Sequence, residues 1–76
     1  SWYIKDKSQL SEKAVVEAIL NYGDFDDFHH LCKILGIQKV ADIFFHLIQQ
    51  PRTNLKKSTI NFFKLYFKRH VPEYPQ

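Results

Sequence analysis

The stretch AILNYGDFDDFHHLCKILG, residues 18–36, contains both glycines of the chain and decides how its helices are divided. Each glycine lies where an apolar repeat of three to four residues stops, as expected at the C-terminal end of a helix. Asp24 is a favourable N-cap residue, and Asp27, three positions later, fits the partner position of a capping box. We therefore predict that one helix ends before Gly23 and that a second runs from Asp24 to Leu35.

Outward from this stretch, the same apolar period continues on both sides. The ranges predicted to be helical are residues 11–22, 24–35, 37–49 and 55–69. Pro51 prevents the third helix from continuing, and no alternation typical of β-strands occurs. Short connections make consecutive helices neighbours in space. We expect a single all-α domain over residues 1–76, folded as a compact bundle of about four helices.

The composition and the N-terminus add to this expectation. Hydrophobic residues make up 45% of the chain and aromatic residues 16%, which excludes an intrinsically disordered segment. Trp2, Tyr3 and Ile4 precede the first helix signal, and bulky apolar side chains are seldom left in water. We expect these three residues to fold back on the bundle as an N-terminal aromatic clasp.

The chain lacks the signals of export and of membrane insertion. No uncharged apolar run approaches the roughly 18 residues that span a bilayer, and the N-terminus has no long apolar stretch of the signal-peptide kind. The single Cys32 excludes an internal disulfide. We expect a soluble cytoplasmic protein with no membrane partner.

Residues suited to catalysis or metal binding are few. Cys32 lies in the apolar stripe of the second predicted helix with Phe25 and Phe28, where a thiol acts as a small hydrophobe and its pKa is raised. His29 is three residues from Cys32, but the histidines His29, His30 and His46 show no paired zinc-ligand spacing. Glycine-rich phosphate loops and nucleophile elbows are absent from the sequence. We therefore predict no enzymatic activity, no metal and no cofactor.

Charge is unevenly distributed along the chain. Before Ile43, seven acidic residues stand against five lysines, a net charge of −2; from Ile43 onward, six basic residues stand against one glutamate, a net charge of +5. A basic half is either a solvated surface or one that meets nucleic acid or an acidic partner. The candidate nucleic-acid contacts in the fourth predicted helix are Lys57, Lys64, Lys68 and Arg69.

Two nucleic-acid readings stay open. Cys32 and Gly36 fit the small residue and the turn glycine of a helix-turn-helix, but Asp42 falls where its recognition helix needs an apolar anchor. Such a motif would be degenerate. The alternative is a DNA- or RNA-binding domain in which the basic fourth helix makes sequence-independent phosphate contacts.

The number of aromatic residues favours protein interaction. Seven Phe, four Tyr and one Trp exceed what a four-helix core needs to hide, and contiguous apolar surface marks a partner or self-association. Phe45 falls outside the apolar stripe of the third predicted helix, and Phe62 and Leu65 lie at the edge of the fourth. We predict that Phe45, Phe62 and Leu65 bind a protein partner or a second copy, although single exposed apolar residues are also ordinary surface.

Four segments resemble a small prokaryotic helical domain family of uncharacterised function. They are Trp2, AILNYGDFDDF at 18–28, KILG at 33–36 and LKKSTINFFKLYF at 55–67. Members are typically encoded beside nucleotidyltransferase-like toxins of the abortive-infection type, so the resemblance implies an antitoxin-like or regulatory companion of such a toxin. It supplies no catalytic residues. The chain departs from the pattern after Asn61, where Phe62 stands in place of the expected tryptophan.

Overall fold

The computed structural model of the chain describes residues 11–72, which form four α-helices and contain no strand. The helices are α1 (Glu12–Tyr22), α2 (Phe25–Leu35), α3 (Ile37–Ile48) and α4 (Lys57–His70). Each begins and ends within two residues of its predicted range. The predicted all-α bundle is therefore confirmed, whereas the predicted clasp of Trp2, Tyr3 and Ile4 lies outside the described residues.

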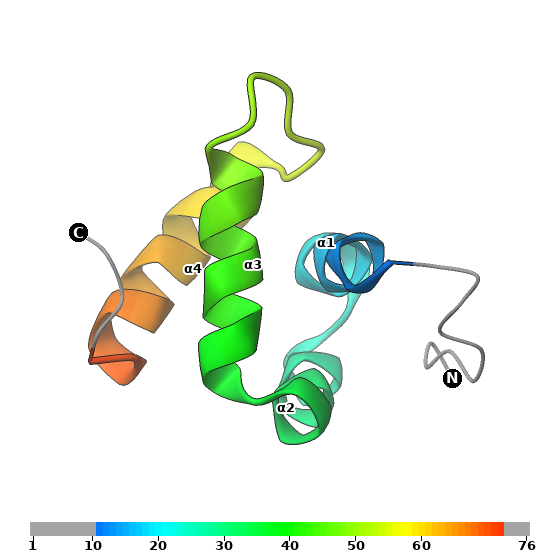
Figure 1. The fold of residues 1–76 in the computed structure, drawn as a ribbon, viewed down its shortest axis with the longest axis vertical. Coiled ribbons are helices and arrows are strands. Elements are labelled where there is room, and N and C mark those ends of the chain that lie inside the picture. The colour runs from blue at the N-terminus through cyan, green and yellow to red at the C-terminus, as the bar shows by residue number, and fades with distance from the viewer. Residues whose placement is uncertain (1–10, 73–76) are drawn as a thin grey trace.

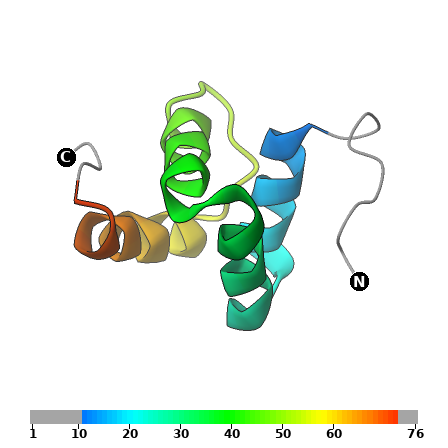
Figure 2. The same ribbon diagram turned by 60° about the horizontal axis from the view of Figure 1, so that its bottom comes forward.

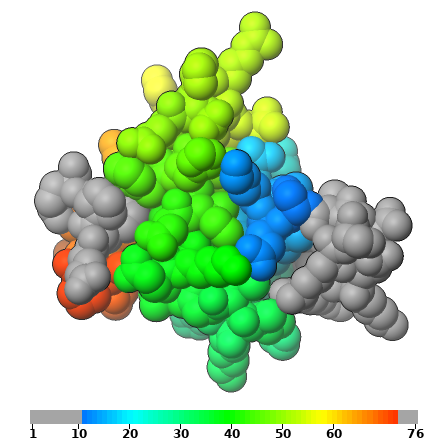
Figure 3. Space-filling view, in the orientation of Figure 1, coloured from blue at the N-terminus to red at the C-terminus, as the bar shows by residue number. Residues whose placement is uncertain are grey.

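The third helix occupies the middle of the bundle. Figure 1 shows α4 on one side of α3 and the pair α1 and α2 on the other, and Figure 2 shows the same order from a second direction. Side chains of α3 form the centre of the face seen in Figure 3, with α1 beside it. Because α3 has neighbours on two sides, it has to bury more of its circumference than a helix at the edge of the bundle.

The junction between α1 and α2 is the capping box that the sequence predicts. The carboxylate of Asp24 accepts a hydrogen bond from the backbone N–H of Asp27 at 2.9 Å, and Asp27 accepts one in return from the N–H of Asp24 at 3.1 Å. Two N–H groups without partners inside the helix are thus satisfied. The carboxylates also complement the positive end of the α2 dipole.

The two glycines end their helices for different reasons. Gly36 has φ of +90°, a conformation that other L-residues rarely adopt, and this one residue joins α2 directly to α3. Gly23 has an ordinary φ of −77°. A Cβ atom on Gly23 would lie 2.9 Å from the carbonyl oxygen of Ile19 and 3.1 Å from the Cβ of Asp27, so the close approach of the capping box requires glycine.

Phenylalanine rings attach α4 to the rest of the bundle. Phe28, Phe44 and Phe67 are fully buried, and the Phe67 ring centroid lies 5.3 Å from that of Phe44 and 6.0 Å from that of Phe28. Phe63 adds a contact with Phe28 at 5.0 Å. Burying one such side chain contributes about 1.5–3 kcal/mol, so these rings determine which face of α4 points inward.

The connection from α3 to α4 is fastened to α1 through Asn21. Its amide nitrogen donates to the carbonyl oxygen of Asn54 at 2.8 Å, and its amide oxygen accepts from the N–H of Lys56 at 3.0 Å. Leu55, between these two residues, is buried in the core. Since Lys56 is the N-cap of α4, the hydrogen bonds of Asn21 join the start of that helix to α1.

Candidate interaction surface on α2 and α4

The circumference of α4 is divided into three faces, as a rotation of about 100° per residue requires. The buried residues on the first face are Thr59, Phe63 and Phe67. The exposed residues on the second face, which is basic, are Lys57, Asn61, Lys64 and Lys68. The residues that line an open hollow of about 260 Å³ on the third face are Phe62, Leu65, Tyr66, Arg69 and His70.

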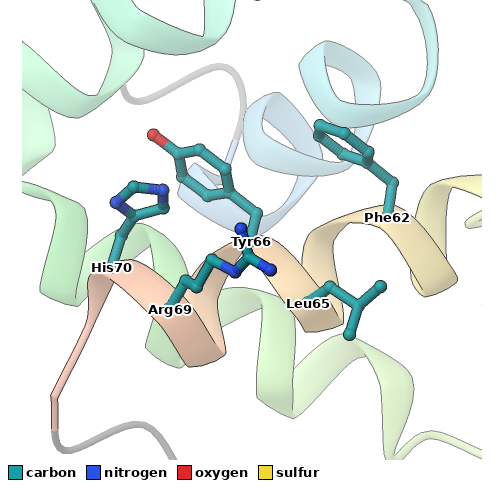
Figure 4. A pocket seen from close by; sticks show the side chains of 5 residues that line it. All are labelled: Phe62, Leu65, Tyr66, Arg69 and His70. Carbon is teal, nitrogen blue, oxygen red and sulfur yellow. The ribbon is translucent and has the colours of Figure 1, made fainter.

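Figure 4 shows how this hollow is built. One row along α4 consists of Phe62, Tyr66 and His70, which are spaced four residues apart. A second row consists of Leu65 and Arg69. Residues four apart on a helix lie one above the other, which explains the two rows. Leu65 is 67% exposed and Phe62 is 51% exposed, so the hollow has apolar walls that open to solvent.

Aromatic contacts hold the first row in place and extend it onto α2. The Tyr66 ring lies 6.2 Å from that of Phe62, nearly parallel to it, and 4.3 Å from that of His70. Phe25 of α2 contacts both Phe62, at 6.3 Å, and Tyr66, at 5.8 Å. We call the set Phe25, Phe62, Leu65, Tyr66 and His70 the aromatic surface.

Two of the three predicted partner-binding residues belong to this surface, and the third does not. Phe62 and Leu65 are exposed and line the same hollow, as their edge position suggested. The expectation that Phe45 projects outside the packed face of its helix is wrong, because Phe45 is half-buried and packs against the core. The physical reason is the central position of α3, whose packed arc extends around two sides.

Phe25 lies on the apolar face of α2 with Phe28, as predicted, and the two ring centroids are 5.6 Å apart. Its side chain is nevertheless 45% exposed. Phe25 occupies the first turn of α2 and contacts exposed Phe62, whereas Phe28, one turn later, is fully buried. Sequence reasoning missed Phe25, Tyr66 and His70 as members of the surface. The i, i+4 spacing of Phe62, Tyr66 and His70 was the available signal.

The four predicted phosphate-binding residues, Lys57, Lys64, Lys68 and Arg69, are all exposed on α4. This helix contains no acidic residue. Within residues 11–72 none of the four has a carboxylate at ion-pair distance, while Lys39 of α3 pairs with Glu12 at 3.0 Å. A basic strip therefore borders the aromatic surface, and Arg69 of this strip also lines the hollow.

Cys32 is half-buried behind this surface and packs against the core, as predicted. Burial raises the pKa of its thiol to about 11, so the group is protonated at neutral pH and is a weak nucleophile. Burial also raises the pKa of Tyr66, with a smaller contribution from Cys32. Over the described part of the chain, no three His, Cys, Asp or Glu side chains lie close enough together to hold a metal ion.

The junction of α2 and α3 differs from a helix-turn-helix. Its connection is the single residue Gly36, whereas the motif uses a turn of three to four residues. Asp42 is exposed on α3 and accepts a hydrogen bond from Gln38 at 3.0 Å. With Lys39 paired to Glu12, the outer face of α3 offers little positive charge to a phosphate backbone.

The fold and the surface define a small helical bundle that presents exposed aromatic side chains beside a basic strip. Comparison with protein-family models, with curated proteins and with solved structures gave no match. None of the helices within residues 11–72 combines the length and the apolar character needed to cross a bilayer. The family suggested by the sequence motifs stays a prediction.

Proposed function

We propose that the chain is a non-enzymatic protein-interaction module whose partner docks on the aromatic surface. One observation carries the proposal. Five large apolar side chains are exposed among residues 11–72, and three of them, Phe25, Phe62 and Leu65, gather on the aromatic surface. Single exposed apolar residues are ordinary, but contiguous ones mark interaction sites.

The construction of the surface supports the same function. Aromatic side chains supply most of the binding energy of many interfaces when they are anchored in place. Tyr66 lies between Phe62 and His70, and α4 itself is anchored by buried Phe63 and Phe67. A surface ordered in this way loses little conformational entropy on binding, which favours affinity.

The identity of the partner is the finer part of the proposal. The motif resemblance suggests a toxin of the nucleotidyltransferase type, with this chain acting as its antitoxin-like or regulatory companion. The single free thiol of Cys32 fits a reducing compartment, so we place the interaction in the cytoplasm.

The test compares two exposed aliphatic positions. Leu65 lies on the aromatic surface, and Ile34, which is 45% exposed on α2, does not line its hollow. A photo-crosslinking amino acid at Leu65 is expected to capture the partner in the native host, and one at Ile34 is not. The protein identified by this capture is then purified in its free form and titrated with the unmodified chain and with its variants.

Leu65→Ser is expected to weaken the reconstituted complex at least tenfold, because burying a leucine contributes about 1.5–3 kcal/mol. Ile34→Ser is expected to leave the affinity unchanged, and neither variant should lower the melting temperature by more than a few degrees. Equal affinity of the Leu65→Ser variant and the unmodified chain would contradict the proposal.

A second candidate function is sequence-independent binding of nucleic acid by Lys57, Lys64, Lys68 and Arg69. The observation that favours it is the absence of acidic residues from α4 and of carboxylate partners for these cations within residues 11–72. Charge reversal of Lys57, Lys64 and Lys68 should abolish retention on a polyanion column at low salt. Unchanged elution of this triple variant would exclude this function.

A further inference from the structure

We infer that the segment which docks on the aromatic surface is an acidic amphipathic helix of the partner protein. This inference rests on the proposed function and makes it more specific. It follows from the juxtaposition, on α4, of the exposed apolar side chains that line the hollow with cations that have no carboxylate partner within residues 11–72.

The shape of the surface fits a helix. The row from Phe62 to Tyr66 to His70 extends eight residues along α4, about 12 Å at 1.5 Å per residue. A docked amphipathic helix uses anchors at i, i+3 or i+4, and i+7, which extend about 10.5 Å. Leu65 and Arg69 form the second wall, so the apolar anchors of a partner helix have a hollow to enter. Addition of an extended strand is not favoured, because residues 11–72 offer no sheet edge.

The cations beside the hollow indicate that the docking segment of the partner carries negative charge. Arg69 lines the hollow, and exposed Lys64 and Lys68 border it, with no acidic residue anywhere in α4. The acidic residues Asp24 and Asp26 of the chain itself flank Phe25 in sequence at the start of α2, and Asp24 is engaged in the capping box. Complementarity therefore calls for Asp or Glu on the flank of the partner helix that faces α4.

Two other occupants fit less well. A second copy that docked through α4 would bring Lys64, Lys68 and Arg69 of the two chains together, and like charges in an interface are costly. Single-stranded nucleic acid needs free ring faces on which bases stack. The faces of Tyr66 are turned toward Phe62 and His70, and Leu65, which is more exposed than Phe25 and Phe62, is aliphatic.

The test titrates the full chain with four labelled probes at low and at moderate salt. The first is a synthetic helical peptide with leucines at i, i+4 and i+7 and glutamates on both flanks. The second has the same leucines and lysine flanks, the third is a scrambled form of the first, and the fourth is an oligothymidylate. We expect the first peptide to bind at least tenfold more tightly than the second and third. In NMR spectra of the chain, the amide chemical-shift changes caused by this peptide should be confined to α4 and the start of α2.

Variants show whether the binding uses the proposed surface. Leu65→Ser should weaken the acidic peptide at least tenfold, and the matched variant Ile34→Ser should not. The double variant Lys64→Glu/Lys68→Glu should reduce the preference for the acidic peptide over the basic one at least threefold, while leaving the fold intact by circular dichroism.

Four results would overturn the inference. They are equal binding of the acidic and basic peptides, binding that Leu65→Ser leaves unchanged, lysine-dependent binding of the oligothymidylate without the peptide, and Leu65-dependent dimerisation of the chain by itself. If none of the peptides binds while a purified partner still loses affinity for the Leu65→Ser variant, the inference of an acidic partner helix is wrong and the proposed function stands. If Leu65→Ser leaves the purified partner unaffected as well, both fail.

Discussion

Substitution of Asn21 tests whether a side chain of α1 sets the position of α4. Asn21→Ala removes the hydrogen bonds to the Asn54 carbonyl and to the Lys56 N–H. Each such bond is worth about 0.5–1.5 kcal/mol net, and both lie near solvent, which recovers part of the loss. Alanine also has a helix propensity higher than that of asparagine by roughly 0.5 kcal/mol, which offsets some of it. We expect the free energy of unfolding to fall by about 1 kcal/mol and the melting temperature by roughly 4–8 °C.

The assay is urea unfolding followed by circular dichroism, with amide hydrogen exchange as a local measurement. Exchange of the Lys56 amide should accelerate in Asn21→Ala more than exchange in the middle of α3. Asn61→Ala, an asparagine on the exposed basic face of α4, is the matched control and should not destabilise the protein. If Asn21→Ala is as stable as the Asn61→Ala variant, the α3–α4 connection is held by other contacts and the reasoning is refuted.

Three further predictions concern the backbone, the core and pH. Gly36→Ala should cost about 1–2 kcal/mol in urea unfolding because φ is +90°; a neutral effect would mean that the junction relaxes. Phe45→Ser should lower the melting temperature, since the half-buried ring contributes on the order of 1–2 kcal/mol, and an unchanged melting temperature would contradict its packing. Burial raises the pKa of Cys32 from 9.0 to about 11, so between those pH values the folded state keeps a proton that the unfolded state has lost. The free energy of unfolding should therefore fall as pH rises through that window, and less so in Cys32→Ala; an equal fall in both proteins would exclude Cys32 as the cause.

The helices were predictable because their ends depend on local signals. Asp24 and Asp27 cap α2 through contacts three residues apart, and Gly23 and Gly36 end the preceding helices. These determinants act over one turn of helix and are visible in a single sequence. The different reasons for the two glycines were not visible, because the close contact at Gly23 depends on where the α2 capping box lies.

The interaction surface was only partly predictable, since exposure depends on how helices cross. Periodicity placed Phe62 and Leu65 at the edge of α4, where the structure has them exposed. It also placed Phe25 on the apolar face of α2 with Phe28, but the pattern of one helix does not show where a neighbouring helix stops covering that face. Phe45 was misplaced for the opposite reason, since α3 is covered on two sides.

The central claim is that the apolar side chains left open on α2 and α4 are a docking site. The most direct test is a calorimetric titration of the partner that crosslinking identifies, purified in its free form, with the Leu65→Ser and Ile34→Ser variants. The account predicts a loss of at least tenfold in affinity for Leu65→Ser and none for Ile34→Ser. Equal affinities of the two variants would show that the partner binds elsewhere.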